Sequence, residues 1–297
     1  FVKDFYDFLH EMRRKNWKNI VRNVLCTPRP MCYNRPEVIS MTLDRPHARQ
    51  AFAEYTSHYN AADPKVKLKI DHTYRVAALC ERIANSLSLP PQDVDLAWLC
   101  GLLHDVGRFE QLRRYGTFID AKSIDHALMS VTVLFEEGRL RDYIAGTDED
   151  ALLRTAIRLH NAYRLPEEMD DRTRMFCQIL RDADKIDILR VNVETPMEQI
   201  YNVSTEALRQ SPVSPAVLNA FYEHHCVLRT LNHYPADNAV GHASFVFELC
   251  YPESLRAVAE QGWLWKLLDF KTENPDTAKA FAGMKAEMQR WLEEHAK

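Results

Sequence analysis

Histidine and aspartate residues stand inside otherwise apolar, helix-like segments of this 297-residue sequence. Imidazoles and carboxylates together suit Zn, Mn, Fe and other divalent first-row ions. Such side chains are costly to bury unpaired, and coordination of a metal ion is one way to satisfy them. The residue types therefore predict a metal site to which several helices each contribute one or two ligands. The predicted ligands are His72, His104, Asp105, His126, His160 and Asp184.

The pair His104-Asp105 is the only His-Asp dipeptide in the sequence. It follows the segment WLCGLL, which is apolar and has small residues one turn before the pair. A packed helix that ends in two adjacent metal-ligand types predicts that both side chains face the site.

Asp184 has two acidic neighbours, Asp182 and Asp187, in the segment ILRDADKID. Helical spacing puts Asp184 on the same face as Leu180 and Ile188, which favours it as the ligand. The two neighbours are interpreted as a surface carboxylate or an acceptor that supports a ligand.

Other charged residues lie close to these ligands in the sequence. Arg108 and Lys185 are candidates for phosphate binding, with surface charges as the alternative interpretation. Asp125 and Asp187 are candidates to orient a ligand histidine from behind.

The order of these residues resembles the signature of the HD superfamily, which reads His, then His-Asp, then Asp. Here it is His72, His104-Asp105 and Asp184, within DHTYRVA, LLHDVGRFE and LRDADKID. The resemblance covers roughly residues 66–190 by the sequence pattern. Members of this family are α-helical and bind one or two divalent metals.

The resemblance also implies a second ion. Family members with two metals carry two more histidines between the His-Asp pair and the last Asp, and His126 and His160 match them in position. The match implies a binuclear site in which Asp105 bridges both ions. The cofactors expected are one or two divalent ions of Mn, Fe, Ni, Co or Zn.

The activity that the resemblance implies is hydrolysis of a phosphate ester. The chain is expected to be a metal-dependent phosphohydrolase or phosphodiesterase that attacks a nucleotide or another small phosphate ester through a metal-bound hydroxide. Asp105, Arg108 and Lys185 are the expected catalytic residues. Two alternatives stay open: an oxygenase with two irons that resembles inositol oxygenase, and a non-catalytic regulatory module.

The elements that must position these residues are predicted to be helices, because apolar residues recur at helical spacing and no alternating strand pattern is apparent. A proline-rich connection over residues 26–47 separates the first two helices. Asp93 and Ser123 are predicted to cap the starts of helices, and Gly107 and Gly138 to end them. The predicted helices cover about residues 1–24, 47–59, 66–87, 93–105, 123–137, 148–160, 172–190, 217–231, 244–249, 255–270 and 276–295.

This order predicts an all-α fold, an HD-domain helical bundle with additional N- and C-terminal helices. Residues 1–60 are expected to be an N-terminal helical extension, and residues 61–195 the metal-binding core. Residues 196–297 are expected to form helices that pack on this core.

Composition limits the partners. The net charge is −4, so no strong field recruits nucleic acid or an anionic membrane. No run of about 18 apolar residues is present, and the N-terminus is charged and amphipathic, unlike a signal peptide. The seven cysteines form no C-x-x-C pair, which favours reduced thiols in a cytoplasm. A small-molecule phosphate ester is the expected partner, and the oligomeric state stays open.

Overall fold

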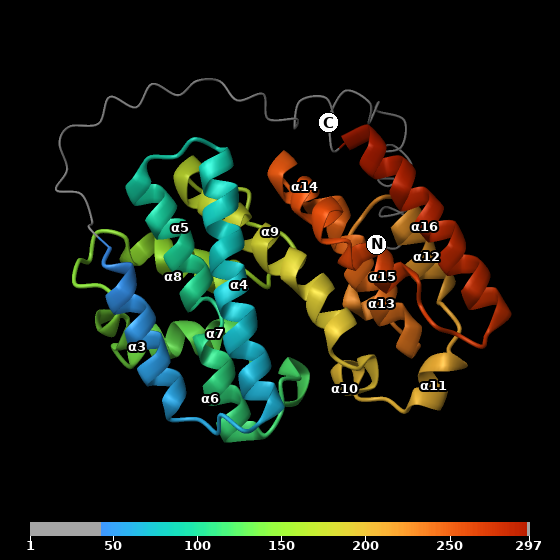
Figure 1. The fold of residues 1–297 in the computed structure, drawn as a ribbon, viewed down its shortest axis with the longest axis horizontal. Coiled ribbons are helices and arrows are strands. Elements are labelled where there is room, and N and C mark those ends of the chain that lie inside the picture. Colours follow the sequence, from blue (N-terminus) through green and yellow to red (C-terminus); the bar gives the residue numbers. More distant parts are fainter. Residues whose placement is uncertain (1–42, 296–297) are drawn as a thin grey trace, which may run out of the picture. The chain divides into compact units, whose positions relative to one another are not determined.

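The computed structural model describes residues 43–295, and this part of the chain is built from helices without a strand (Figure 1). The predicted all-α class is therefore confirmed. All of these residues belong to one compact unit, Met41–Lys297. The helix predicted at 1–24 and nearly all of the connection at 26–47 lie outside the described residues. The domain boundaries near residues 60 and 195 stay predictions.

Seven α-helices make up the part of the fold that carries the predicted ligands (Figure 1). The closest partners among them are α4 and α5, and α9 packs against α4, α5 and α8. Their bounds are α3 (Arg45–Ser57), α4 (Pro64–Ser86), α5 (Pro91–Leu103), α6 (Val106–Tyr115), α7 (His126–Val131), α8 (Asp150–Leu159) and α9 (Asp171–Glu194).

The C-terminal helices follow α9, whose second half reaches them (Figure 1). Helices α13, α14 and α15 and the turn η5 all contact α9 directly. The elements are α10 (Met197–Tyr201), α11 (Thr205–Arg209), α12 (Pro215–Tyr222), α13 (Pro235–Ala243), η5 (Ser244–Glu248), α14 (Pro252–Gln261), α15 (Trp263–Leu268) and α16 (Pro275–His295).

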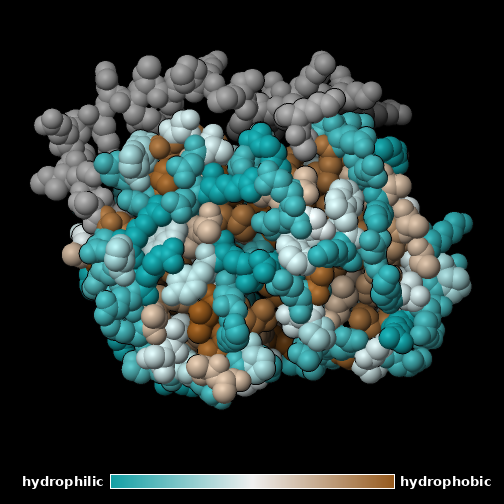
Figure 2. Space-filling view, viewed as in Figure 1, coloured by the Kyte–Doolittle hydropathy of each residue, from teal (hydrophilic) through white to brown (hydrophobic). Residues whose placement is uncertain are grey.

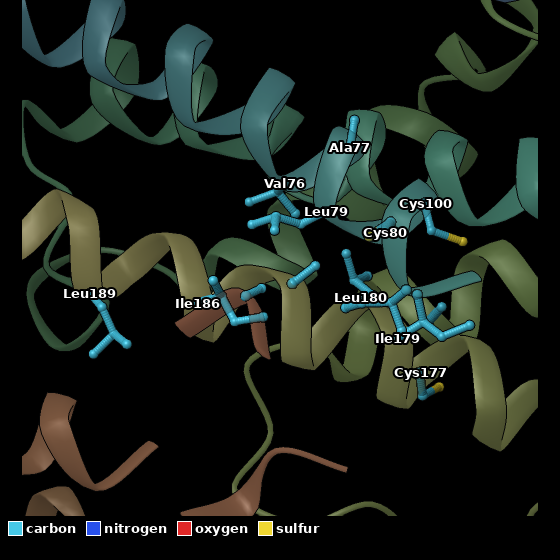
Figure 3. Packing of buried hydrophobic residues seen from close by; sticks show 14 of the residues in the cluster. Val76, Ala77, Leu79, Cys80, Cys100, Cys177, Ile179, Leu180, Ile186 and Leu189 are labelled. Atoms are coloured by element: carbon cyan, nitrogen blue, oxygen red, sulfur yellow. The ribbon is translucent and has the colours of Figure 1, made fainter. Parts of the chain in front are cut away.

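Helices α4 and α5 touch through their backbones. A Cβ atom added to Gly101 of α5 would lie 2.6 Å from the Cα of Ala77 in α4, so only glycine permits this approach. Buried side chains of α4 and α9 belong to one hydrophobic cluster, among them Val76 and Leu180 (Figure 3). The core therefore fixes α4, α5 and α9 relative to one another, and with them the residues that they carry.

Gly107 does not end a helix, contrary to the prediction. Helix α5 ends at Leu103, and α6 begins at Val106 with Asp105 as its N-cap, so Gly107 lies inside α6. A Cβ atom at this position would lie 2.2 Å from the backbone nitrogen of Ser130 in α7. Glycine is needed here for the close crossing of α6 and α7, which a pattern within one helix cannot reveal.

The predicted helix starts were also partly wrong. Pro90 is the N-cap of α5, and Asp93 lies in the first turn, where its charge suits the helix dipole. Asp125 caps α7 in place of Ser123, because its carboxylate accepts the backbone N–H groups of Ala127 and Leu128. Helix α7 continues as a π-helical turn, η2 (Thr132–Glu136), and ends before Gly138 as predicted.

Two predicted C-terminal helices are shorter or divided. Helix α12 ends at Tyr222, before the left-handed residue His224. The segment from Leu255 to Phe270 is split at Gly262, whose φ of 69° cannot continue a right-handed helix.

No helix among residues 43–295 is long and apolar enough to cross a membrane. On the face shown in Figure 2, hydrophilic residues predominate and hydrophobic ones show between them.

Candidate metal centre

Most of the predicted ligands lie at helix ends, which converge in the core. His104 is the C-cap of α5 and Asp105 the N-cap of α6. His126 is the first residue of α7, and His160 is the C-cap of α8. His72 lies within α4, and Asp184 within α9. Side chains at helix ends can turn toward a common centre without breaking the helices that carry them.

The first group of ligand atoms contains the histidines of α4 and α5. His72 Nε2 lies 3.3 Å from His104 Nε2 and 3.2 Å from Asp184 Oδ1. Asp105 Oδ2 lies 3.6 Å from His72 Nε2 and 3.5 Å from His104 Nε2. Two imidazoles and two carboxylates therefore surround one point.

The second group contains the histidines of α7 and α8. His126 Nε2 lies 3.1 Å from His160 Nε2. The other oxygen of Asp105, Oδ1, lies 3.9 Å from His126 Nε2 and 3.8 Å from His160 Nε2. Asp105 thus stands between the two groups and offers one oxygen to each.

The outer nitrogens of two histidines show how the rings are protonated. His104 Nδ1 lies 2.8 Å from the carbonyl oxygen of Gly101, and His160 Nδ1 lies 2.8 Å from that of Ile157. A carbonyl oxygen only accepts hydrogen bonds, so each Nδ1 carries a proton and donates it. In the neutral rings the lone pair is then on Nε2, which faces the centre.

The other two histidines are held by carboxylates. His72 Nδ1 lies 2.6 Å from Asp187, whose oxygens accept two hydrogen bonds from Arg75. His126 Nδ1 lies 2.6 Å from Asp120. A carboxylate behind a ligand imidazole fixes its orientation and raises its basicity.

The structure brings Asp187 to a ligand histidine, as expected, but not Asp125. Asp125 is engaged by backbone N–H groups at the start of α7. Asp120, which the sequence analysis missed, belongs to the 3₁₀ turn η1 (Asp120–Lys122). Its place in an irregular connection explains the omission, because no helical period relates it to His126.

The three aspartates in the middle of α9 make different contacts. Asp184 faces the ligand cluster, and Asp187 supports His72. Asp182 accepts hydrogen bonds from the backbone of Cys250 and Tyr251, and so ties the C-terminal part to α9. Burial raises the pKa of Asp182 to about 6.

The charges of the centre suit metal coordination. Burial alone would raise the pKa of Asp105, but Lys69, His104 and Arg108 hold it well below its usual range. Burial, together with the neighbouring His126 and His104, lowers the pKa of His160 to about 3. An ionised aspartate and a neutral histidine are the forms that bind a divalent ion.

One buried oxygen atom of the centre lacks a hydrogen-bond partner. Asp105 Oδ1 is buried and has no hydrogen-bond partner, and the Nε2 atoms of His126 and His160 lie 3.9 and 3.8 Å from it. Arg108 Nε lies 3.6 Å from this oxygen, beyond hydrogen-bond distance, whereas a bound divalent ion would engage the oxygen and both imidazoles directly. The residues therefore fit divalent cations, and two overlapping candidate clusters share His104: His72, His104 and Asp184, and His104, Asp105 and His160.

Two cationic side chains flank Asp105. Lys69 Nζ lies 2.7 Å from Oδ2, and Arg108 Nε lies 3.6 Å from Oδ1. Sequence reasoning missed Lys69, although it lies one turn before His72 on the same face of α4. Lys185 forms a 3.0 Å ion pair with Glu248 of η5, and its contact with substrate stays a prediction.

The first part of the connection after His160 is held by the guanidinium of Arg181. Arg181 of α9 is 8% exposed and donates to the carbonyl oxygens of Leu159, Ala162 and Tyr163. This contact fixes the C-terminal end of α8, and thereby the backbone that carries His160.

Comparison with known proteins agrees with this geometry. Residues 70–189 match the family model of the HD domain, and the matched range includes all six predicted ligands. No curated protein and no solved structure matches the chain.

Proposed function

We propose, from the premise that residues 70–189 of this chain form an HD domain, that the protein is a divalent-metal-dependent phosphohydrolase or phosphodiesterase. The observation that carries the proposal is the buried carboxylate of Asp105, which lies between two groups of imidazole nitrogens and whose Oδ1 atom has no hydrogen-bond partner. A shared carboxylate with two histidines on each side is a donor set for two ions.

The residues divide between the two ions as follows. His72, His104 and Asp184 would hold the first ion together with Asp105 Oδ2. The second ion would be held by His126, His160 and Asp105 Oδ1. The second group has one carboxylate fewer, so an ion there would have one protein ligand fewer and one more position for water or substrate.

Bound divalent ions supply Lewis acidity, which polarises a phosphoryl oxygen and lowers the pKa of a water molecule. The chain itself supplies orientation. Asp187 and Asp120 hold His72 and His126 from behind, so the Nε2 atoms stay directed at the centre. Arg108 Nε is buried without a hydrogen-bond partner beside the second group, and would donate to a phosphoryl oxygen there.

The balance of charge favours an anionic substrate. Three cationic side chains lie among four carboxylates, so two divalent ions would make the whole centre clearly positive. A phosphate ester matches this field, whereas the oxygenase alternative takes a neutral polyol. The side chains are Lys69, Arg75 and Arg108 with Asp105, Asp120, Asp184 and Asp187.

Reconstitution of the metal-free protein tests the proposal. Mn, Co, Ni, Zn or Fe(II) is added without oxygen, the bound metal is measured, and phosphate release is followed over nucleotides and simple phosphate esters. We expect turnover that requires metal and disappears in His104→Ala. Oxygen consumption with two irons and no phosphate release would establish the oxygenase instead. Full metal binding with neither activity would establish a regulatory module.

A further inference from the structure

Lys69 occupies a position that the metal ligands do not account for. Its ammonium nitrogen lies 2.7 Å from Asp105 Oδ2, the oxygen that belongs to the first group of ligand atoms. An ammonium has three N–H donors, and this contact engages one of them. Lys69 also lies 5.9 Å from the ring centroid of Phe118, which borders the same space.

Solvent reaches the centre at Lys69 and also at Asp120, whose side chain is 22% exposed. The four ligand histidine side chains are between 0% and 8% exposed. By contrast, the side chain of Lys69 is 17% exposed, and those of Arg108 and Asp184 are each 13% exposed. A substrate that approaches the ligand cluster therefore meets Lys69 and Arg108 beside the two candidate ions.

Lys69 and Arg108 lie beside different oxygens of the Asp105 carboxylate. Lys69 contacts Oδ2 and Arg108 lies near Oδ1, and both lie within 6 Å of the same Phe118 ring. An anion bound across the two ion positions would have a cation at each side. With both ions bound, Lys69 and Arg108 would bring the number of positive centres around one phosphoryl group to four.

We propose that Lys69 determines the specificity of this site by contacting a non-bridging oxygen of a terminal phosphate, so that phosphomonoesters are preferred to phosphodiesters. The inference rests on the proposed hydrolase function. A monoester carries about two negative charges near neutral pH, since its second pKa is about 6, and offers three non-bridging oxygens. In a diester, which carries one charge and offers two such oxygens, one oxygen facing the ions and one facing Arg108 would leave none for Lys69, whereas the third oxygen of a monoester would meet it.

The test compares three variants in the Mn²⁺-loaded protein. Lys69→Met removes the charge at similar size, Lys69→Arg retains it, and Lys67→Met is the control. Lys67 lies on the same helix, but its side chain is 70% exposed and pairs with Asp71. The probes are p-nitrophenyl phosphate as monoester, bis(p-nitrophenyl) phosphate as diester, and inorganic phosphate as a ligand measured by calorimetry.

We expect Lys69→Met to lower kcat/KM for the monoester about 10- to 100-fold, the range for loss of one charge-assisted hydrogen bond. The diester should change less than about threefold, and phosphate should bind about 10-fold more weakly or worse. Lys69→Arg should recover part of both effects, and Lys67→Met should match the wild type. The Mn²⁺ content should be the same in all variants.

Three results would overturn the inference: equal losses with both esters, loss of Mn²⁺ from both Lys69 variants, or an unchanged affinity for phosphate. The phosphate titration does not depend on turnover. If the wild type hydrolyses neither these esters nor the nucleotides, the proposed function fails, while a phosphate affinity that falls in Lys69→Met still supports the contact with Lys69.

Discussion

At the scale of single residues, the imidazole of each predicted ligand is fixed by an acceptor behind it. Two rings donate to backbone carbonyl oxygens and two are held by aspartates. The protein therefore determines the direction of every Nε2 atom before a metal binds. Asp105 is the one predicted ligand that both groups share, and its Oδ1 atom has no hydrogen-bond partner.

Replacing Asp105 by Asn should affect both ions at once. The substitution keeps the size of the side chain but removes the negative charge that bridges the two groups. We expect loss of activity and of most bound metal, with the helical circular dichroism spectrum largely retained. Metal analysis after gel filtration measures the effect, with Asp71→Asn on the exposed face of α4 as the control. Wild-type turnover at equal metal content would show that Asp105 is not catalytic.

Replacing His126 or His160 by Ala should remove the second ion preferentially. Both Nε2 atoms lie near Asp105 Oδ1, whereas His72, His104 and Asp184 surround the first position. Calorimetric titration should show about two equivalents of metal for the wild type and about one for each variant, with a strongly reduced rate. Saturation of the wild type at one equivalent, with no effect of either substitution, would leave a mononuclear site.

At the scale of elements, helix ends and helix crossings place the ligands. The C-terminal end of α8 is held by Arg181, and the crossing of α6 and α7 is permitted by Gly107. Neither residue contacts the ligand atoms, yet each fixes a backbone segment that carries one.

Arg181→Met should weaken binding of the second ion. Loss of the guanidinium frees the carbonyl groups after α8 and lets His160 move. We expect the affinity for the second metal to fall about 10-fold, as is typical for groups that orient ligands, while the first site is little changed. Arg174→Met is a matched control, because Arg174 donates to Pro166 and Glu167 farther along the same connection. Equal effects of both substitutions on the second ion would contradict the role of Arg181.

Gly107→Ala should destabilise the fold and disturb the site. The added Cβ would meet the backbone of Ser130 at 2.2 Å, so α6 and α7 must separate. We expect a loss of about 1–3 kcal/mol in the free energy of unfolding, the usual cost of overpacking. Gly146→Ala has open space around the new Cβ and should change this free energy by less than about 0.5 kcal/mol. Urea unfolding of the two variants measures the difference.

At the scale of the whole molecule, metal binding would join helices that are distant in the sequence. The ligands come from α4, from the junction of α5 and α6, and from α7, α8 and α9. Helix α9 extends this connection to the C-terminal helices through Asp182 and Lys185.

Removal of metal should therefore lower the thermal stability of the whole unit. A ligand at 100 times its Kd stabilises the folded state by about 2.7 kcal/mol. For a unit of this size, each kcal/mol corresponds to about 2–4 °C in Tm. Calorimetric scans should show a Tm about 5–10 °C lower after treatment with a chelator, and full recovery when metal is restored. Asp105→Asn should not respond to metal, and a response equal to that of the wild type would contradict the bridging position.

The sequence by itself determined the helical class and proposed the residues that now lie together. Apolar residues at helical spacing predict helices, and a histidine or an aspartate among them is conspicuous because it is costly to bury alone. This reasoning singled out His104, Asp105 and Asp184 without reference to the fold. It also identified the break before Gly138, since glycine readily adopts a positive φ.

Only the tertiary structure decided which groups surround these ligands. Lys69 and Arg181 lie on helices that the sequence predicts well, but periodicity says only which residues share a face of one helix. It does not say that Lys69 meets Asp105, or that Arg181 meets the connection after α8. Asp120 lies in an irregular turn, where no period exists, and Gly107 is required by a crossing between two helices. These contacts join residues on different elements, and their geometry is set by how the helices pack rather than by any single segment of the chain.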